Sequence, residues 1–185
     1  MPKAKTDLSQ FNNNWYNPGA GVIKRTLWYF VNAFVLKGAM PFMGIKRSLL
    51  QLFGAKIGSN FTIKPHVSIK YPWNLEIGNN VWLGENVWID NLGKVKIGNN
   101  VCISQGALIL SGNHNYAKSK FDLIVKDIII EDGAWIGAKS TVSQGVTIGS
   151  HAVLSVNSVA STNLEAYAIY RGNPAVKVKD RVIEE

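Results

Sequence analysis

An isoleucine, leucine or valine recurs every six residues through most of the chain, and this period constrains the fold more than any other feature. Six residues match neither the 3.6-residue period of an α-helix nor the two-residue alternation of a half-buried strand. A short internal repeat of this kind predicts a stack of similar units, each burying its apolar residue against the next. The series is Ile57, Ile63, Ile69, Ile77, Leu83, Ile89, Ile97, Ile103, Ile109, Ile130, Ile136, Val142, Ile148 and Leu154, and it fades through Ala160 and Ala166.

Each six-residue unit suits a short strand followed by a turn. Glycine often follows the aliphatic residue, as at Gly58, Gly78 and Gly84, and we expect it at a tight corner, where it is conformationally cheapest. Three units would make one triangular coil, so five coils fit between Ile57 and Glu165. Small or branched residues at the fifth place predict a second inward row: Val67, Val81, Val87, Val101, Ala107, Ala134, Ser140, Val146, Ala152 and Ser158.

The repeat is interrupted three times. The steps from Ile69 to Ile77 and from Ile89 to Ile97 are eight residues long, and the third break separates Ile109 from Ile130. With three units per coil, all three breaks fall at one corner of the triangle. We therefore expect one edge to carry extra chain, with its longest loop over residues 111–127. Excursions from a rigid scaffold are where functional sites usually lie.

Two apolar-faced helices are predicted ahead of the repeat, over residues 22–36 and 46–53. One interpretation is a cap over the open end of the stack, which solenoids need. The other is an interfacial membrane helix, because aromatic residues lie beside Lys24 and Arg25. The predicted organisation is an N-terminal extension over 1–56, a hexapeptide-repeat β-helix over 57–166 and a C-terminal segment over 167–185.

Composition narrows the function classes. Cys102 is the only cysteine, so no disulfide framework and no cysteine-based metal site is expected. We expect a cytoplasmic location, with peripheral contact at the inner face of the membrane through the N-terminal helices as an open alternative. The polar first twenty residues are unlike a secretory signal. The net charge of +8 indicates an anionic partner, either a phosphorylated cofactor, a membrane or a nucleic acid. The sequence has no nucleic-acid recognition motif, so we expect no nucleic-acid partner.

Three further motifs accompany the repeat. Ser111-Gly112-Asn113-His114 enters the long loop, Gly133-Ala134-Trp135-Ile136-Gly137 resumes the repeat, and Arg171-Gly172-Asn173-Pro174-Ala175 follows its end. With the repeat, they resemble the hexapeptide-repeat acyltransferases over about two thirds of the chain. The segments 52–58 and 70–73 look most like the colanic-acid-type O-acetyltransferases of exopolysaccharide synthesis. The resemblance implies a mainly β fold: a left-handed parallel β-helix of about five triangular coils, with a small N-terminal helical cap and one extruded loop.

The resemblance also implies a function. It implies an acetyl-CoA-dependent O-acetyltransferase that acts on a sugar hydroxyl in exopolysaccharide or surface polysaccharide synthesis. Family members are homotrimers with active sites between neighbouring subunits, and they need no metal. A lipid-linked carbohydrate is one acceptor; serine, free galactoside or maltose and antibiotic hydroxyls stay open. A β-helical binding protein without catalysis and a membrane-surface or nucleic-acid binder are the alternatives of other classes.

His114 is the predicted general base. Transfer of an acetyl group from a thioester to a hydroxyl requires a base for the alcohol proton, and an imidazole suits that role near neutral pH. The resemblance places the catalytic histidine of the family at this position. The other histidines, His66 and His151, fall on different coils and cannot meet within one chain, so we expect no histidine-based metal site in a single chain. A metal that bridges subunits stays open.

Residues for the two substrates follow from position and resemblance. Asp90 and Asn91 lie on the interrupted edge one coil from His114 and are predicted to bind the acceptor or to orient the imidazole; a polar turn is the alternative. Glu85 and Asn86 are weaker acceptor candidates. The resemblance places Trp135 along the coenzyme A arm. The other predicted coenzyme residues are Gly137, Ala138, Ser155, Ser161, Arg171, Gly172, Pro174, Lys177 and Lys179. The chain has Thr162 where the family pattern usually has lysine.

Overall fold

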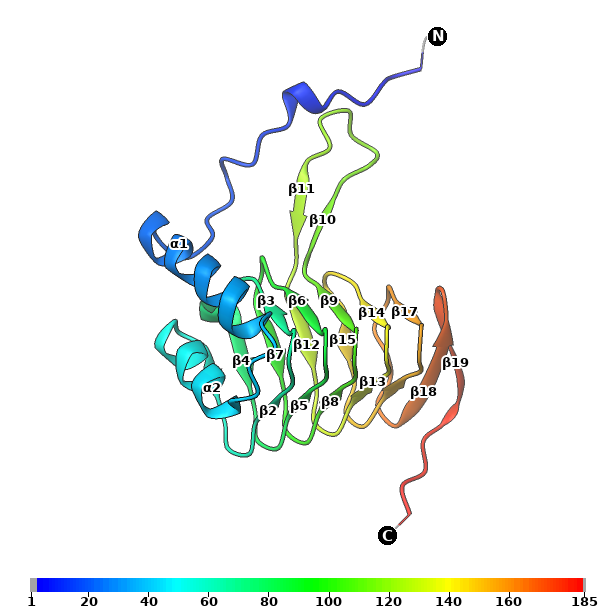
Figure 1. Ribbon diagram of the computed structural model, residues 1–185. Coiled ribbons are helices and arrows are strands. Elements are labelled where there is room, and N and C mark those ends of the chain that lie inside the picture. The colour runs from blue at the N-terminus through cyan, green and yellow to red at the C-terminus, as the bar shows by residue number, and fades with distance from the viewer. Residues whose placement is uncertain (1–2, 185) are drawn as a thin grey trace.

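A computed structural model of the protein describes residues 3–184, and most of them form a three-sided parallel β-solenoid (Figure 1). Each side of the prism is one parallel sheet that gains a strand with every turn of the chain. The β1 sheet contains β1 (Lys56–Ile57), β4 (Leu75–Ile77), β7 (Val95–Ile97), β12 (Ile128–Ile130) and β15 (Thr147–Ile148). The β2 sheet contains β2 (Thr62–Ile63), β5 (Trp82–Leu83), β8 (Cys102–Ile103), β13 (Trp135–Ile136), β16 (Val153–Leu154) and β18 (Ala168–Gly172). The β3 sheet contains β3 (Ser68–Ile69), β6 (Trp88–Asp90), β9 (Leu108–Leu110), β14 (Thr141–Val142) and β17 (Val159–Ala160).

The predicted stack of five coils is confirmed, and a sixth turn begins after it. Leu164 bridges to Ile148 of the β1 sheet, and β18 adds a further strand beside β16. The last inward position differs from the prediction: Leu164 is buried, whereas Ala166 is exposed. The reason is that the chain reaches the next face of the prism four residues after Ala160, because the turn there is shorter than in the regular repeat.

The two predicted inward rows form the core. Ile63, Ile69 and Leu83 are at most 1% exposed, and so are most of their counterparts in later turns. The second row is also buried, including Ser140 and Ser158. Ser140 satisfies its buried hydroxyl by donating to the carbonyl of Ser155 at 2.7 Å. Each fully buried branched aliphatic side chain contributes about 1.5–3 kcal/mol, so the period itself stabilises the fold.

The glycines after the inward aliphatic residues serve a different purpose from the expected one. Gly58 and Gly84 do not have positive φ. A Cβ on Gly58 would lie 2.7 Å from the backbone of Gly78, and one on Gly84 would lie 2.6 Å from the backbone nitrogen of Gln105. Glycine is therefore required because the next turn approaches too closely for a side chain, and not for its conformational freedom.

Asparagines take the left-handed conformation at one of the corners. Asn60, Asn80 and Asn100 have φ between 52° and 56° in successive turns. Their side-chain amides form a column in which Asn60 donates to Asn80, and Asn80 to Asn100, each at 2.9 Å. Asparagine tolerates this conformation better than other residues with a side chain, so the column combines turn formation with contact between turns.

The N-terminal helices cap the open end of the stack, as one of the two interpretations predicted. They are α1 (Val22–Val31), which continues as the π-helical η2 (Asn32–Leu36), and α2 (Met43–Leu52). Trp28 is 2% exposed and donates its indole N–H to the carbonyl of Ile69 at 2.9 Å. Leu36 and Leu50 are also fully buried in the same core. Within residues 3–184, no helix is both long and apolar enough to cross a membrane.

All three interruptions leave the stack between the β3 and β1 sheets, as predicted. The first contains the short helix η3 (Pro72–Asn74), and the second is a turn after Asp90. The third, residues 111–127, is a β-hairpin of β10 (Gly112–His114) and β11 (Leu123–Val125), which we call the arm. Residues 7–20, including η1 (Leu8–Gln10), run from α1 along the arm and form what we call the strap (Figure 1). At the other end, β19 (Ala175–Asp180) pairs antiparallel with β18.

Candidate active site

His114 ends strand β10 of the arm, and its ring has a defined tautomer. Its Nδ1 lies 2.9 Å from the carbonyl oxygen of Phe121 on the other side of the hairpin. Because a carbonyl oxygen only accepts hydrogen bonds, Nδ1 must carry the proton in the neutral ring. The lone pair is then on Nε2, which is the form that a general base requires.

Aromatic rings hold the imidazole in place. The ring of Phe121 stacks on it with centroids 4.5 Å apart, and the ring of Phe11 from the strap meets it edge-on at 5.5 Å. Phe121 has φ of 55°, an uncommon conformation for a bulky residue and one that costs about 1–3 kcal/mol. This conformation accompanies the carbonyl contact to His114. Sequence reasoning missed Phe121 and Phe11, since neither belongs to a motif and both contacts depend on the path of the arm and strap.

A pocket of about 650 Å³ lies beside His114, between the strap, α1 and the arm. The strap supplies one wall and is fixed at three points: the Asp7 amide donates to Ser119 O at 2.8 Å, the Tyr16 hydroxyl to Leu92 O at 2.9 Å, and the Trp73 indole to Pro18 O at 2.6 Å. Polar and aromatic side chains line the pocket, among them Asn13, Tyr16, Arg25, Lys70, Tyr71 and His114.

Asp90 and Asn91 lie below this pocket but do not contact His114 through any hydrogen bond of the described residues. Asp90 forms an ion pair with Lys70, with 3.0 Å between Oδ1 and Nζ, although the geometry does not make it a hydrogen bond. Asn91 is fully buried. Its side chain accepts from the Tyr71 amide at 2.9 Å and donates to the Tyr71 carbonyl at 2.6 Å. Asn91 therefore shapes the turn, in line with the polar-turn alternative, and it is not available to an acceptor.

Glu85 and Asn86 lie at a different corner of the prism, between β5 and β6. Glu85 lines a surface pocket of about 380 Å³ on the β2 sheet, together with Thr62, Trp82 and Cys102. Asn86 has φ of 59°, as expected of a corner asparagine. Within one chain the structure therefore does not bring these two residues to His114, because the β2 sheet is the side of the prism opposite the edge that carries the arm.

The β2 sheet carries a second pocket of about 440 Å³, which shares Ser104 and Gln105 with the first. We call the two pockets together the groove. Its walls include the predicted coenzyme residues Trp135, Gly137, Ala138 and Ser155. Trp135 is 47% exposed and donates its indole N–H to Ser104 Oγ at 2.9 Å.

Trp82 belongs to the same groove, and sequence reasoning missed it although a signal was present. Trp82, Cys102 and Trp135 align as neighbours across successive strands. Each directly precedes an inward aliphatic residue on the same face of successive coils. Counting faces would therefore have placed Trp82 beside the position of Trp135.

The predicted C-terminal coenzyme residues lie at the end of the stack that bears β18 and β19. Arg171 and Gly172 end β18, Pro174 is in the following turn, and Ser161 is exposed after β17. Lys177 and Lys179 belong to β19 and are exposed. Lys177 forms ion pairs at 2.9 Å with Glu165 and Asp180, and its hydrogen bonds to these carboxylates raise its pKa. Lys177 is thus engaged within the chain, and β16 separates this hairpin from the strand that carries Trp135.

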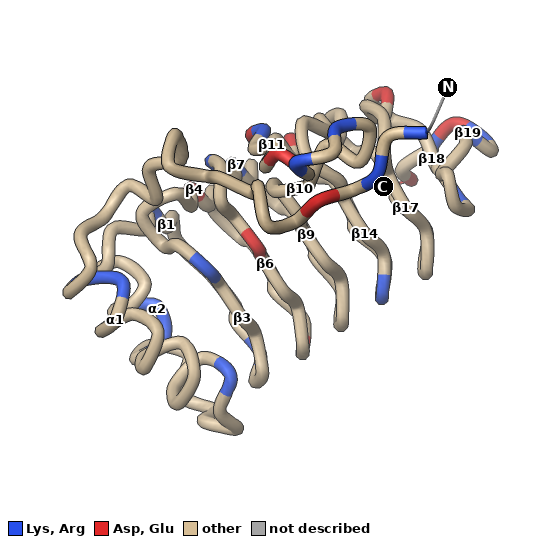
Figure 2. Tube along the Cα trace, turned by 90° about the horizontal axis from the view of Figure 1, so that it is seen from above, with Lys and Arg blue, Asp and Glu red and all other residues tan. Residues whose placement is uncertain are grey.

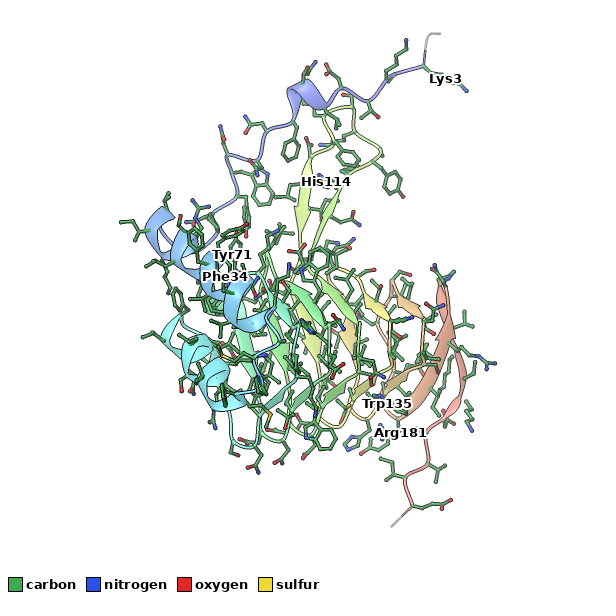
Figure 3. The ribbon with its side chains drawn as sticks, viewed as in Figure 1. Lys3, Phe34, Tyr71, His114, Trp135 and Arg181 are labelled. Atoms are coloured by element: carbon green, nitrogen blue, oxygen red, sulfur yellow. The ribbon has the colours of Figure 1, made fainter. Side chains whose placement is uncertain are left out.

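The arm and the groove are on opposite sides of the solenoid in one chain (Figure 3). The label of His114 lies above the stack on the arm, and that of Trp135 lies below it on the β2 sheet. No side chain of the pocket lines the groove. Within residues 3–184, no three His, Cys, Asp or Glu side chains converge as a metal site would require.

Comparison with known proteins agrees with this architecture. A family model described as the hexapeptide repeat of succinyl-transferase matches residues 127–159. The chain is 37% identical over 180 residues to the Escherichia coli (strain K12) protein assigned as the colanic acid biosynthesis acetyltransferase WcaF, covering 97% of this chain and 99% of that one. It is 29% identical over 143 residues to the galactoside O-acetyltransferase of the same strain, covering 76% of this chain and 68% of that protein.

A solved structure extends the likeness to three dimensions. The hexapeptide-repeat acetyltransferase of Vibrio cholerae O1 biovar eltor, complexed with acetyl coenzyme A, superposes with a TM-score of 0.79 at 21% identity, covering 87% of this chain and 88% of that one. At this identity the likeness establishes the fold, and it confirms the predicted left-handed parallel β-helix.

Proposed function

Because the chain belongs to the hexapeptide-repeat acetyltransferases, we propose that it transfers the acetyl group of acetyl-CoA to a hydroxyl of a sugar in surface polysaccharide synthesis. The observation that carries this proposal is the tautomer of His114. Its Nδ1–H is donated to the Phe121 carbonyl, so Nε2 is the basic nitrogen beside a pocket of about 650 Å³. A pocket of that size suits a sugar-sized ligand.

The proposed reaction is a direct transfer. The acceptor oxygen attacks the thioester carbonyl carbon while His114 Nε2 takes its proton, and the C–S bond breaks as the tetrahedral intermediate collapses. The imidazolium then returns the proton to the coenzyme A thiolate, so no acyl-enzyme forms. The Phe121 carbonyl assists because it accepts a hydrogen bond from the Nδ1–H of the imidazolium, the role that a carboxylate has in catalytic triads.

We propose the groove as the acetyl-CoA site. Its walls combine an exposed indole with small residues such as Gly137 and Ala138, which leave room for an extended thiol chain. The thioester must reach Nε2, and in one chain the groove and the arm are on opposite sides of the prism. A homotrimer in which each arm reaches the groove of a neighbouring copy brings them together, and exposed Trp82 and Trp135 suit that contact.

We also propose that the cap contacts the cytoplasmic face of the membrane peripherally. Its outer face exposes large apolar side chains: Val22, Ile23, Leu27, Tyr29, Phe30, Phe34, Phe42, Met43, Ile45 and Leu52. Residues 8–75 contain eight Lys or Arg and no Asp or Glu. Figure 2 shows both helices with basic and no acidic positions. An apolar face with basic residues around it is typical of interfacial binding, and it would bring the pocket close to lipid-linked acceptors.

An acceptor screen tests the proposed function. The purified protein is incubated with acetyl-CoA and a panel of free sugars, sugar phosphates and lipid-linked oligosaccharides. Release of the coenzyme A thiol is followed in parallel with mass spectrometry of the product. We expect thiol release that depends on a carbohydrate and an O-acetylated product. Transfer only to serine or to an antibiotic hydroxyl, or no transfer at all, would contradict the proposed acceptor class.

A further inference from the structure

The pocket beside His114 contains a cation without a counter-ion. Arg25, the fourth residue of α1, is half-buried and lines this pocket. None of the ion pairs within residues 3–184 includes Arg25. Arg25 thus brings to the pocket wall a positive charge that no carboxylate of the described residues neutralises, and an anionic ligand in the pocket would supply the missing counter-ion.

The other charges around the pocket do not neutralise Arg25. Lys70 lines the same pocket, and its ammonium lies 3.0 Å from the carboxylate of Asp90. The negative charge of Asp90 is therefore already neutralised by Lys70. Burial raises the pKa of Tyr16, with smaller contributions from Tyr71 and Asp90, so the hydroxyl stays neutral and donates to Leu92 O. Two cations therefore face one carboxylate, and the pocket is left with one net positive charge.

The remaining walls suit a carbohydrate. Tyr71 stacks on Trp73 with ring centroids 5.0 Å apart, which fixes its ring at the pocket wall. Asn13 and Asn14 of the strap add amide groups that can donate to and accept from hydroxyls. A concave site with aromatic surface and a few polar groups is the usual form of a small-ligand site.

We propose, on the basis of the proposed function, that this pocket binds an acceptor sugar that carries a negatively charged group, and that Arg25 binds that group. A guanidinium fits two oxygens of a carboxylate or a phosphate at once, and such charged hydrogen bonds are stronger than neutral ones. Arg25 would then select and orient the acceptor, while the proton transfer stays with His114.

Two sources could supply the charge: the carboxylate of an acidic sugar, or a phosphate that links the sugar to a carrier. Arg25 also lines a shallow depression of about 330 Å³ on the outer face of the cap, together with Val22, Tyr29 and Phe30. The guanidinium thus lies between the pocket and this apolar surface. A phosphate bound there would connect a sugar in the pocket with an apolar chain on the cap.

The test compares kcat/KM for four acceptors: a neutral methyl hexoside, the matching methyl uronide, the matching hexose 1-phosphate, and the sugar on a polyprenyl diphosphate. Arg25→Gln removes the positive charge. Arg25→Lys keeps the charge but loses the planar guanidinium that can bind two oxygens at once. Lys37→Gln, which changes an exposed cation of the same cap, is the matched control.

We expect the wild-type protein to prefer an anionic acceptor at least about tenfold, and Arg25→Gln to lower kcat/KM for that acceptor about 10- to 100-fold. The methyl hexoside should be unaffected, Arg25→Lys should be intermediate, and Lys37→Gln should resemble wild type.

Which anionic acceptor is favoured identifies the source of the charge. Equal use of neutral and anionic sugars by the wild-type protein would overturn the inference, and so would an equal loss for every acceptor in Arg25→Gln. Calorimetric binding of the uronide and the phosphate without acetyl-CoA gives a readout independent of turnover. If an anionic sugar binds tightly and Arg25→Gln weakens that binding, the pocket assignment is supported. If no sugar is acetylated in the same experiments, the proposed function is contradicted. Thermal unfolding and coenzyme A binding confirm that each variant is folded.

Discussion

The arm edge and the groove of the β2 sheet use one scaffold in opposite ways. The groove is made by strands and corners of the regular repeat, with Trp82, Cys102 and Trp135 aligned across successive turns. The pocket at His114 is made by chain that leaves the stack or precedes it: the arm, the strap, α1 and the two shorter interruptions. On the proposed function, the regular repeat binds the acetyl donor that these acetyltransferases share. The interruptions of the repeat bind the acceptor, which differs among them.

Replacement of His114 by alanine should have the largest effect. Loss of the base should lower kcat about 10²- to 10⁴-fold, while the groove on the opposite side keeps its affinity for coenzyme A. Steady-state kinetics and calorimetric titration with coenzyme A measure the two quantities separately. Tyr116→Ala, an 87% exposed arm residue, is the control and should be near wild type. A His114→Ala protein with normal turnover would remove the imidazole from the mechanism.

A mixing experiment asks whether the two regions cooperate within one chain or between chains. Ala138→Trp should fill the groove and, like His114→Ala, be nearly inactive alone. In a one-to-one mixture refolded together, half of the arms and half of the grooves are intact. About a quarter of the sites between copies then pair an intact arm with an intact groove, so about a quarter of wild-type activity should return. Mixing folded proteins without refolding is the control. If refolded mixtures stay inactive although both variants co-assemble, the site lies within one chain.

The cap is a third surface, separate from both the pocket and the groove. Phe30→Ser with Phe34→Ser should weaken binding to anionic phospholipid vesicles about tenfold or more, because two exposed aromatic anchors are lost. Co-sedimentation measures the binding, and turnover of a soluble acceptor should not change. Val176→Ser with Val178→Ser, exposed at the opposite end of the solenoid, is the matched control. Equal losses in both double variants would speak against the cap as the docking surface.

Trp135→Ala should have the smallest effect, and it should be confined to the donor. Loss of the indole wall should raise KM for acetyl-CoA about tenfold and leave kcat nearly unchanged. Trp88→Ala, half-exposed on the neighbouring β3 sheet, is the control. A fall in kcat without a change in KM would place Trp135 near the reacting atoms. The groove would then take part in the chemical step as well as in donor binding.

Sequence could predict most of the fold because one signal is repeated in almost every turn. The inward rows and the common edge of the three interruptions followed from the six-residue period, and the cap was one of two interpretations of the helices that precede the repeat. The repeat fails only at its end, where Leu164 replaces Ala166. The role of the glycines was wrong for a physical reason: proximity of the next turn is a relation between residues about 20 positions apart, which a local turn argument does not contain.

The pocket was less predictable, because its contacts join segments with no shared pattern. The strap reaches the arm across more than a hundred residues of sequence, and Phe11 meets His114 only because of that path. Arg25 was interpreted only as a cation beside the aromatic residues of an interfacial helix, and its lack of an ion-pair partner is visible only in three dimensions. Glu85 and Asn86 have the chemistry of acceptor ligands but lie at another corner of the prism from His114 of the same chain, with Glu85 on the wall of the groove.

The concentration of all three excursions at one edge has a consequence for how such enzymes can diversify. Turns of the stack lock together through backbone contacts at the glycines, so insertions there would separate neighbouring coils. The edge between the β3 and β1 sheets is already open, and its segments can lengthen, shorten or exchange without disturbing the register beneath. With the two substrate sites as proposed, a lineage built on this plan can acquire a new acceptor by remodelling that edge while inheriting its donor chemistry unchanged.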